Sequence, residues 1–371
     1  ELEELNDLML KDLQRRRNIE PNELDKLRIA QRIRTYSGKT GVALDRAKAK
    51  WDIPFIEQLQ EFNDPDPLKL MGDYWYARYA KTRNKNIEKL LNRSNVRMSD
   101  ENGDPYGSGM GNAEADNLLR FIEKHPEFNK VKKLTKHFDA MNKGTIDRLL
   151  EDGVLPQDQY DKILKNAVDE NGNWVWAPLR GFEKDYAESY PTGLDGIIDA
   201  VDSDIKSGGQ GTGSGFSQTG SQFALTHAFG RTNKANSYEI WGNAFKSHSE
   251  SIVRGFKNTE TSQSLLELLR SVDKDPALKD EWGGLFEIID SGDEDFKKRF
   301  PTKMIPYISS DPRFAQMGLP SHSQTFVKEI AVNPLDSEAM RDSVFTVRIK
   351  GRPVYILFKG DVGKRIVRSL K

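Results

Sequence analysis

Apolar residues along most of this chain recur at the spacing of an amphipathic helix. Steps of three and four residues run through residues 2–36, 68–91 and 236–272, and they predict helices in all three stretches. Gly242 and Gly255 interrupt the third stretch, where they predict either a kink or a close contact with another helix. The chain is therefore expected to be built mainly of helices.

The C-terminal part follows a second pattern. Polar and apolar residues alternate through residues 344–358 around a turn at 351–353, which predicts a β-hairpin. Residues 361–370 predict a short basic amphipathic helix, and residues 174–182 are expected to be extended and buried after a tight turn. These patterns predict a mainly α protein with a small C-terminal β-hairpin (α+β), with a multi-helix, elongated or two-part architecture.

Shifts in composition divide the chain into six expected segments. They are an N-terminal helical segment (1–97), a loop (98–112), a helical domain (113–206), a Gly/Ser-rich linker or loop (207–222), a long-helix segment (223–298) and a C-terminal α+β segment (299–371). The Gly/Ser-rich stretch has the composition of a flexible linker, and a ligand-binding loop is the alternative interpretation.

The overall composition is that of a folded protein with a very polar surface. The chain has 371 residues, of which 30% are charged and 9% aromatic, and its formal net charge is −1. It has no cysteine, which excludes disulfides, Cys-ligated zinc, iron–sulfur clusters and thiol nucleophiles. No apolar run reaches the roughly 18 residues that a membrane-spanning helix needs. Because the sequence begins at Glu1 without Met or a signal peptide, we expect it to be a piece of a longer polypeptide.

Several short motifs resemble ligand sites but fail on spacing. Residues 37–40, Ser-Gly-Lys-Thr, lack the earlier glycine of a phosphate-binding loop, so they are expected to be a helix end followed by a turn. Residues 100–111 resemble a calcium loop, but Pro105 and Gly111 stand where that loop needs Gly and Glu. The five histidines show no zinc-helix spacing. We therefore assign no catalytic residue, no cofactor and no metal site.

Basic residues supply the candidates for contact with a nucleic acid or a protein partner. They are Arg231 and Lys234 and, in the expected hairpin and final helix, Arg348, Lys350, Arg352, Lys364, Arg365 and Arg368. A net charge near zero gives no general attraction to phosphate. A solvated basic face is therefore favoured over a DNA-binding surface.

The serial order of six segments that follow a leucine-rich helix carries a resemblance to a known class. The segments are residues 152–160, 176–182, 229–231, 252–258, 265–269 and 344–358, with the Gly-rich stretch before the third. This order resembles a module of the large polyvalent proteins of tailed bacteriophages and related mobile elements, which are packaged in the virion and ejected into the host with the DNA. The chain has Lys350 before the hairpin glycine, where the module commonly has Asp or Asn.

The resemblance implies a non-enzymatic segment of an internal virion (ejection) protein, located inside the capsid and then in the host cell. Its partners would be other phage virion proteins or further copies of itself, with phage DNA as a second expectation. One alternative is a fragment of an antirestriction or DNA-modification polyprotein in the host cytoplasm that binds DNA through the C-terminal hairpin and helix. Another is a hydrolase in which His227 or His248 converges with two carboxylates.

Overall fold

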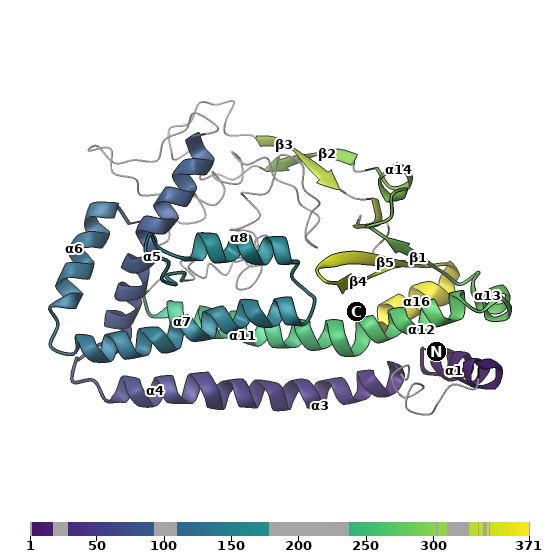
Figure 1. Cartoon of the computed structure of the whole chain (residues 1–371), viewed down its shortest axis with the longest axis horizontal. Coiled ribbons are helices and arrows are strands. Elements are labelled where there is room, and N and C mark those ends of the chain that lie inside the picture. The colour runs from purple at the N-terminus through teal and green to yellow at the C-terminus, as the bar shows by residue number, and fades with distance from the viewer. Residues whose placement is uncertain are drawn as a thin grey trace.

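The molecule is elongated and mainly helical, with its long helices side by side along the major axis (Figure 1). The computed structural model describes residues 2–17, 29–92, 110–177, 237–301, 303–309, 326–332, 334–336, 340 and 342–370. Within this part of the chain every helix is too short or too polar to span a lipid bilayer. The predicted class, mainly α with a small C-terminal β structure, is confirmed.

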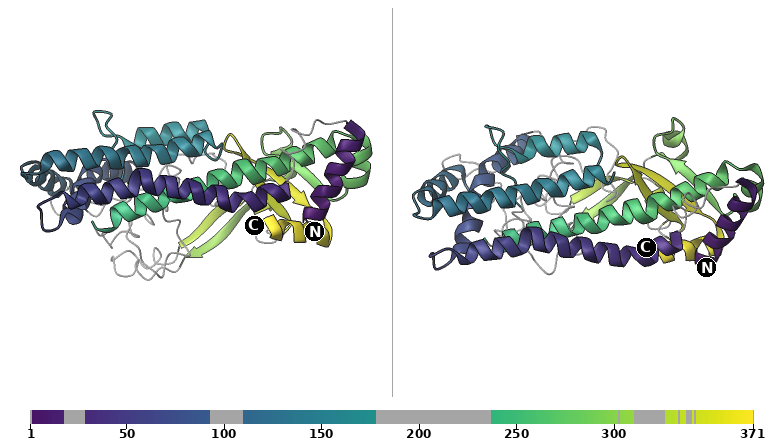
Figure 2. Two further views of the ribbon diagram at one scale, coloured as in Figure 1. Left: turned by 90° about the horizontal axis from the view of Figure 1, so that it is seen from below. Right: turned by 60° about the horizontal axis from the view of Figure 1, so that its bottom comes forward.

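Twelve α-helices are described, and two π-helical segments join some of them into longer rods. The helices are α1 (Leu2–Arg17), α3 (Ile29–Ala47), α4 (Ile53–Gln60), α5 (Pro67–Asn92), α6 (Asn112–Glu123), α7 (Phe128–Glu151), α8 (Gln157–Ala167), α11 (Glu239–Phe256), α12 (Gln263–Asp273), α13 (Pro276–Trp282), α14 (Phe296–Arg299) and α16 (Gly360–Leu370). The π segment η1 (Lys48–Asp52) connects α3 to α4, and η2 (Lys257–Ser262) connects α11 to α12. Figure 2 shows the two resulting rods running next to each other. The helices predicted over 68–91, 236–272 and 361–370 are thereby confirmed.

The expected helix end at residues 37–40 is wrong, because these residues lie inside α3. Gly38 and Gly41 face open space, so neither glycine is there for a turn. Packing against α11 holds the helix instead: Thr40 is buried, and the Tyr36 hydroxyl donates to the Val253 carbonyl at 3.2 Å. Tertiary contacts thus outweigh the low helix propensity of glycine.

A three-stranded antiparallel sheet lies beside α12, with strand order β1-β5-β4. The strands are β1 (Phe286–Asp290), β4 (Val344–Ile349) and β5 (Arg352–Phe358). The predicted hairpin is confirmed, whereas β1 was not predicted as a strand. A separate antiparallel pair is formed by β2 (Lys303–Ser309) and β3 (Phe326–Val332).

The hairpin turn differs from the expected one at 351–353. It consists of two residues, Lys350 and Gly351, which both have positive φ angles of 51° and 76°. Arg352 and Pro353 already belong to β5. Two-residue turns of this kind match the twist of the flanking strands and favour Gly, Asn or Asp where φ is positive. The lysine therefore occupies a position that costs it backbone strain.

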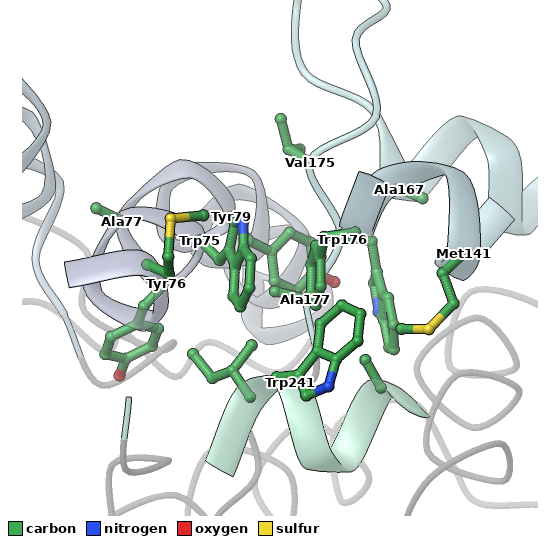
Figure 3. Close-up of a cluster of buried hydrophobic side chains, with 14 of the residues drawn as sticks. Trp75, Tyr76, Ala77, Tyr79, Met141, Ala167, Val175, Trp176, Ala177 and Trp241 are labelled. Atoms are coloured by element: carbon green, nitrogen blue, oxygen red, sulfur yellow. The ribbon is translucent and has the colours of Figure 1, made fainter. Parts of the chain in front are cut away.

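The larger core is aromatic and draws on α4 to α8 and α11. Figure 3 shows part of it, with side chains from α5, α7, α8, α11 and residues 175–177. The Trp75 ring stacks on Phe138 with centroids 4.0 Å apart, and Phe55 stacks on Trp241 at 3.7 Å. The predicted extended, buried segment contributes to it: residues 175–177 are buried, while residues 178–182 lie outside the described residues.

The sheet has a core on each face. Leucines of α12, residues of α16 and two residues of α1 cover one face, and α14 with the 3-10 turn η4 (Pro334–Asp336) covers the other. Alternation along β5 divides its side chains accordingly, with Val354 and Ile356 on the first face and Tyr355 on the second. Both described ends of the chain, α1 and α16, therefore lie at the sheet end of the molecule (Figure 1).

Candidate functional site

Three segments that are distant in sequence meet at one junction: η2, the turn between α7 and α8, and the β4–β5 turn. The Asn258 side chain, on η2, lies at its centre. Its Nδ2 donates to the Asp152 carbonyl at 2.9 Å and to the Arg348 carbonyl at 3.0 Å. Its Oδ1 accepts from the Arg348 backbone N–H at 3.1 Å. A single amide thus links the helical part of the molecule to the sheet.

Glycine allows the two turns of the junction to approach each other. The Gly351 N–H donates to the Gly153 carbonyl at 2.7 Å, and Gly153 has a φ of 68°. A Cβ placed on Gly351 would lie 2.1 Å from the backbone nitrogen of Pro156. Real side chains do not tolerate such a distance, so the contact requires glycine.

A third glycine makes room for a carboxylate at the same place. A Cβ on Gly255 would lie 1.8 Å from Asp152 Oδ2. Arg148 Nε stands 3.2 Å from that oxygen, and its guanidinium lies over the Phe256 ring at 5.2 Å. Burial raises the pKa of Asp152, and the positive charge of Arg148 opposes the rise. Asp152 Oδ2 and Arg148 Nε are buried and face each other in an ion pair without a hydrogen bond. The Asn258 amide and the turn backbones, in contrast, bind other parts of the chain, so the junction is a structural contact between elements.

The first rod docks on the second next to this junction. Glu260 on η2 accepts from Lys39 Nζ at 2.8 Å and from Arg32 at 3.3 Å, both on α3. The Tyr36 hydroxyl of α3 also donates to the Val253 carbonyl on α11, so these three bonds fix α3 along the α11–η2 rod. The π segments therefore lie at contacts between elements, as interruptions of helices often do.

His248 on α11 is the one hydrolase candidate that the described residues contain. Its Nδ1 lies 2.9 Å from Thr145 Oγ1 on α7, and the Trp51 ring is 5.9 Å away. Burial lowers its pKa to about 4, and the nearby charges of Arg148 and Lys50 add to the effect. The charged groups that shift this pKa are cations, so the predicted convergence with two carboxylates is not seen around it. His227 lies outside the described residues.

Among the described carboxylates, Asp139 has the most strongly raised pKa, and it forms an ion pair that joins two helices. Asp139 on α7 accepts from both terminal nitrogens of Arg78 on α5, at 3.2 and 3.0 Å. Burial raises its pKa to about 6, although Arg78 opposes the rise. Arg78 also donates to the Trp174 carbonyl, which ties the buried segment 174–177 to α5. In the described part of the chain no three His, Cys, Asp or Glu side chains are grouped as metal ligands would be.

Three of the predicted basic contact residues bind other groups of the same chain. Arg348 donates to the Gly351 carbonyl at 3.0 Å. The Arg352 guanidinium lies 3.3 Å from Asp290. On α16, Arg368 lies 2.7 Å from Asp342.

The remaining predicted basic residues are dispersed. Lys350 is exposed at the hairpin turn, and Lys364 and Arg365 are exposed on α16. Arg231 and Lys234 lie outside the described residues. The structure therefore brings no compact group of these side chains together.

Exposed basic residues outside the predicted set occur on η1 and on α7. They are Lys48 and Lys50 on η1 and Lys132, Lys133 and Lys136 on α7. Lys130, also on α7, is half-buried and paired with Glu127 at 2.7 Å.

Comparison of the chain with profiles of known protein families, with curated proteins and with solved structures finds no match in any of the three.

Proposed function

We propose that this chain is a non-enzymatic segment of an internal virion protein of a tailed bacteriophage, carried in the capsid and delivered into the host with the DNA. One observation supports the proposal above the rest. Three of the six segments that resemble the phage module, residues 152–160, 252–258 and 344–358, meet at the Asn258 junction. This convergence supports a shared packing role for these segments, as a scaffold would require.

The physical character of the chain is consistent with passage through a narrow tail. A protein that is threaded must unfold and refold, and disulfides would oppose this. The chain has no cysteine. Its partners under this proposal are other virion proteins or further copies of the same chain.

Mass spectrometry of purified virions from the element that encodes this chain tests the proposal. Peptides from residues 29–92 and 239–300 should be recovered at a fixed ratio to the capsid protein through successive density gradients. A host protein of similar abundance in the lysate is the control, and its ratio should fall at each step. A chain that is lost together with that control protein is not a virion component.

A second candidate is an antirestriction or DNA-modification fragment that binds DNA in the host cytoplasm. The exposed Lys350, Lys364 and Arg365 favour it. The ion pairs of Arg352 and Arg368 weaken it, because both charges are already partly compensated. Loss of a salt-dependent DNA shift on replacing those three exposed residues with Gln would support this candidate.

A further inference from the structure

We propose that Asn171 is a site of spontaneous covalent modification, at which the side-chain amide is hydrolysed to a carboxylate through a cyclic imide formed with the backbone of Gly172. The two residues lie in the turn of residues 169–173, between α8 and the buried residues 175–177. Among the described residues, Asn171 is the one asparagine that is followed by glycine. Water is the co-reactant, and ammonia is the leaving group.

The reaction joins two atoms of neighbouring residues. The Gly172 backbone nitrogen gives its proton to hydroxide and attacks the side-chain carbonyl carbon of Asn171, which closes a five-membered ring. The bond from that carbon to Nδ2 breaks, and Nδ2 leaves as ammonia after taking a proton from water, which restores the hydroxide. Water then opens the ring at either carbonyl and gives aspartate or isoaspartate. Attack within one chain benefits from the closeness of the two groups, so no enzyme is needed.

The turn leaves both reacting groups open to solvent. Asn171 and Gly172 are exposed, and a Cβ placed on Gly172 would meet nothing within 4 Å. Glycine has no side chain that hinders the approach of its own nitrogen. The Asn171 amide forms no hydrogen bond with another described residue, so its carbonyl carbon is free to be attacked.

Asp169 is the residue that holds the turn closed. Its carbonyl accepts from the Gly172 N–H at 3.1 Å, so the nitrogen must leave this bond before it attacks. Its Oδ1 accepts from the N–H groups of Asn171 and Asn173, both at 2.9 Å. These bonds lie among exposed residues, and a segment with few buried contacts opens locally at a small cost in free energy. The fold therefore slows the reaction without preventing it.

Two buried asparagines show why the reaction should be selective for Asn171. The Asn258 amide is engaged in three hydrogen bonds, and the β-branched Thr259 crowds the nitrogen that would have to attack. Asn84 lies inside α5, where its Nδ2 donates to the Met110 carbonyl at 2.9 Å. Their packing and their neighbours in sequence oppose ring closure.

The product alters the entry into the buried segment 174–177. Its new carboxylate follows Asp169 and Glu170 in the chain and so adds a third negative charge to the turn, where Lys85 lies 3.3 Å from Glu170. In isoaspartate the backbone also runs through an additional carbon, which displaces the N–H groups that Asp169 binds. Trp174 follows directly, and its carbonyl accepts from Arg78 on α5. The modification should therefore loosen this end of the segment.

Incubation of the full chain at mildly alkaline pH, followed by tryptic mapping, tests the inference. Cleavage after Lys165 and Arg180 releases residues 166–180 as one peptide, in which fragment masses separate Asn171 from Asn166 and Asn173. We expect aspartate and isoaspartate at position 171. Conversion at the other two asparagines should be at least about tenfold lower, because neither is followed by a residue whose nitrogen is equally accessible.

The variant Asn171→Gln is the matched control, since it keeps an exposed amide before Gly172. Its longer side chain would have to close a larger ring, so position 171 should react at least about tenfold more slowly. Circular dichroism verifies that the variant folds.

Three results would overturn the inference. They are conversion only in the urea-unfolded chain, equal conversion at Asn166 or Asn173, or an undiminished rate in the Gln variant. The inference does not depend on where the chain is located, so it and the proposed function fail separately.

Discussion

The side chain of Asn258 pairs with the backbone of Arg348 as a neighbouring strand would, accepting from its N–H at 3.1 Å and donating to its carbonyl at 3.0 Å. β4 is an outer strand of the sheet, so these backbone groups have no strand partner on that side. Gln263 Nε2 adds a bond of 3.3 Å to the same carbonyl. The rod thus covers an open sheet edge, which would otherwise invite pairing with another chain.

Replacing Asn258 with Ala should lower the free energy of unfolding by about 2–3 kcal/mol, because it leaves partly buried backbone groups of Asp152 and Arg348 without partners. Urea denaturation measures the change. Asn129→Ala, at an exposed position of α7, is the control and should stay within about 0.5 kcal/mol of the unchanged protein. Equal effects of the two substitutions would refute a central role for Asn258.

Gly351→Ala should destabilise the protein by more than Gly172→Ala. Both glycines have positive φ angles, of 76° and 79°, so both substitutions carry the same backbone cost of about 1 kcal/mol. Gly172 faces open space, whereas a Cβ on Gly351 meets Pro156. The clash should add about 1–3 kcal/mol. Equal losses in thermal or urea unfolding would show that the two turns do not touch.

Two glycines of α11 should respond in opposite directions. Gly242→Ala, in open space, should stabilise the protein by up to about 1 kcal/mol through higher helix propensity. Gly255→Ala should destabilise it by about 1–3 kcal/mol, because the new methyl group meets the Asp152 carboxylate. Midpoints of urea unfolding compare the two variants, and stabilisation by both would contradict the close packing at Gly255.

Stability should fall as the pH drops from about 6.5 to 4, through His248. The folded pKa of His248 is about 4, against an ordinary value of 6.5, so in this window the unfolded chain binds a proton that the folded protein does not. The loss should reach about 3 kcal/mol at the acid end. The raised pKa of Asp139, about 6, acts in the opposite direction over part of the window.

Comparison with His248→Gln isolates the histidine from Asp139. The variant keeps Asp139, so the difference in unfolding free energy between the two proteins should change with pH only through His248. Parallel pH profiles of the two proteins would mean that His248 is not buried in its neutral form.

Local periodicity was sufficient to predict the helices over residues 68–91 and 236–272, the hairpin and α16. The sheet was harder to predict, because β1 pairs with β5 across a long separation, Phe286 opposite Phe358. The predicted helix end at residues 37–40 was wrong for a similar reason. Gly38 and Gly41 lower the helix propensity of α3, but tertiary contacts stabilise the helix there. Whether a segment forms a helix or a strand follows from the spacing of its own apolar residues. Which segments pair or pack together depends on contacts between parts of the chain that are far apart in sequence.

The candidate sites were harder to predict from the sequence than the helices were. The order of segments 152–160, 252–258 and 344–358 was noticed, but their convergence on Asn258 depends on three turns that no local pattern connects. Charge counting identified Arg352 and Arg368 as contact residues, and the fold pairs both with Asp. Ion pairing is a property of the folded surface, so runs of basic residues in the sequence alone could not show which side chains are paired.

The most direct test of the proposed role is the amount of this chain in virions before and after they release their DNA. Quantitative mass spectrometry with isotope-labelled peptides would compare full particles with particles emptied by a receptor or a membrane trigger. The account predicts that the chain is present in full particles and leaves with the DNA, while the capsid protein remains. Absence from full particles, or retention of the chain in the emptied ones, would contradict it.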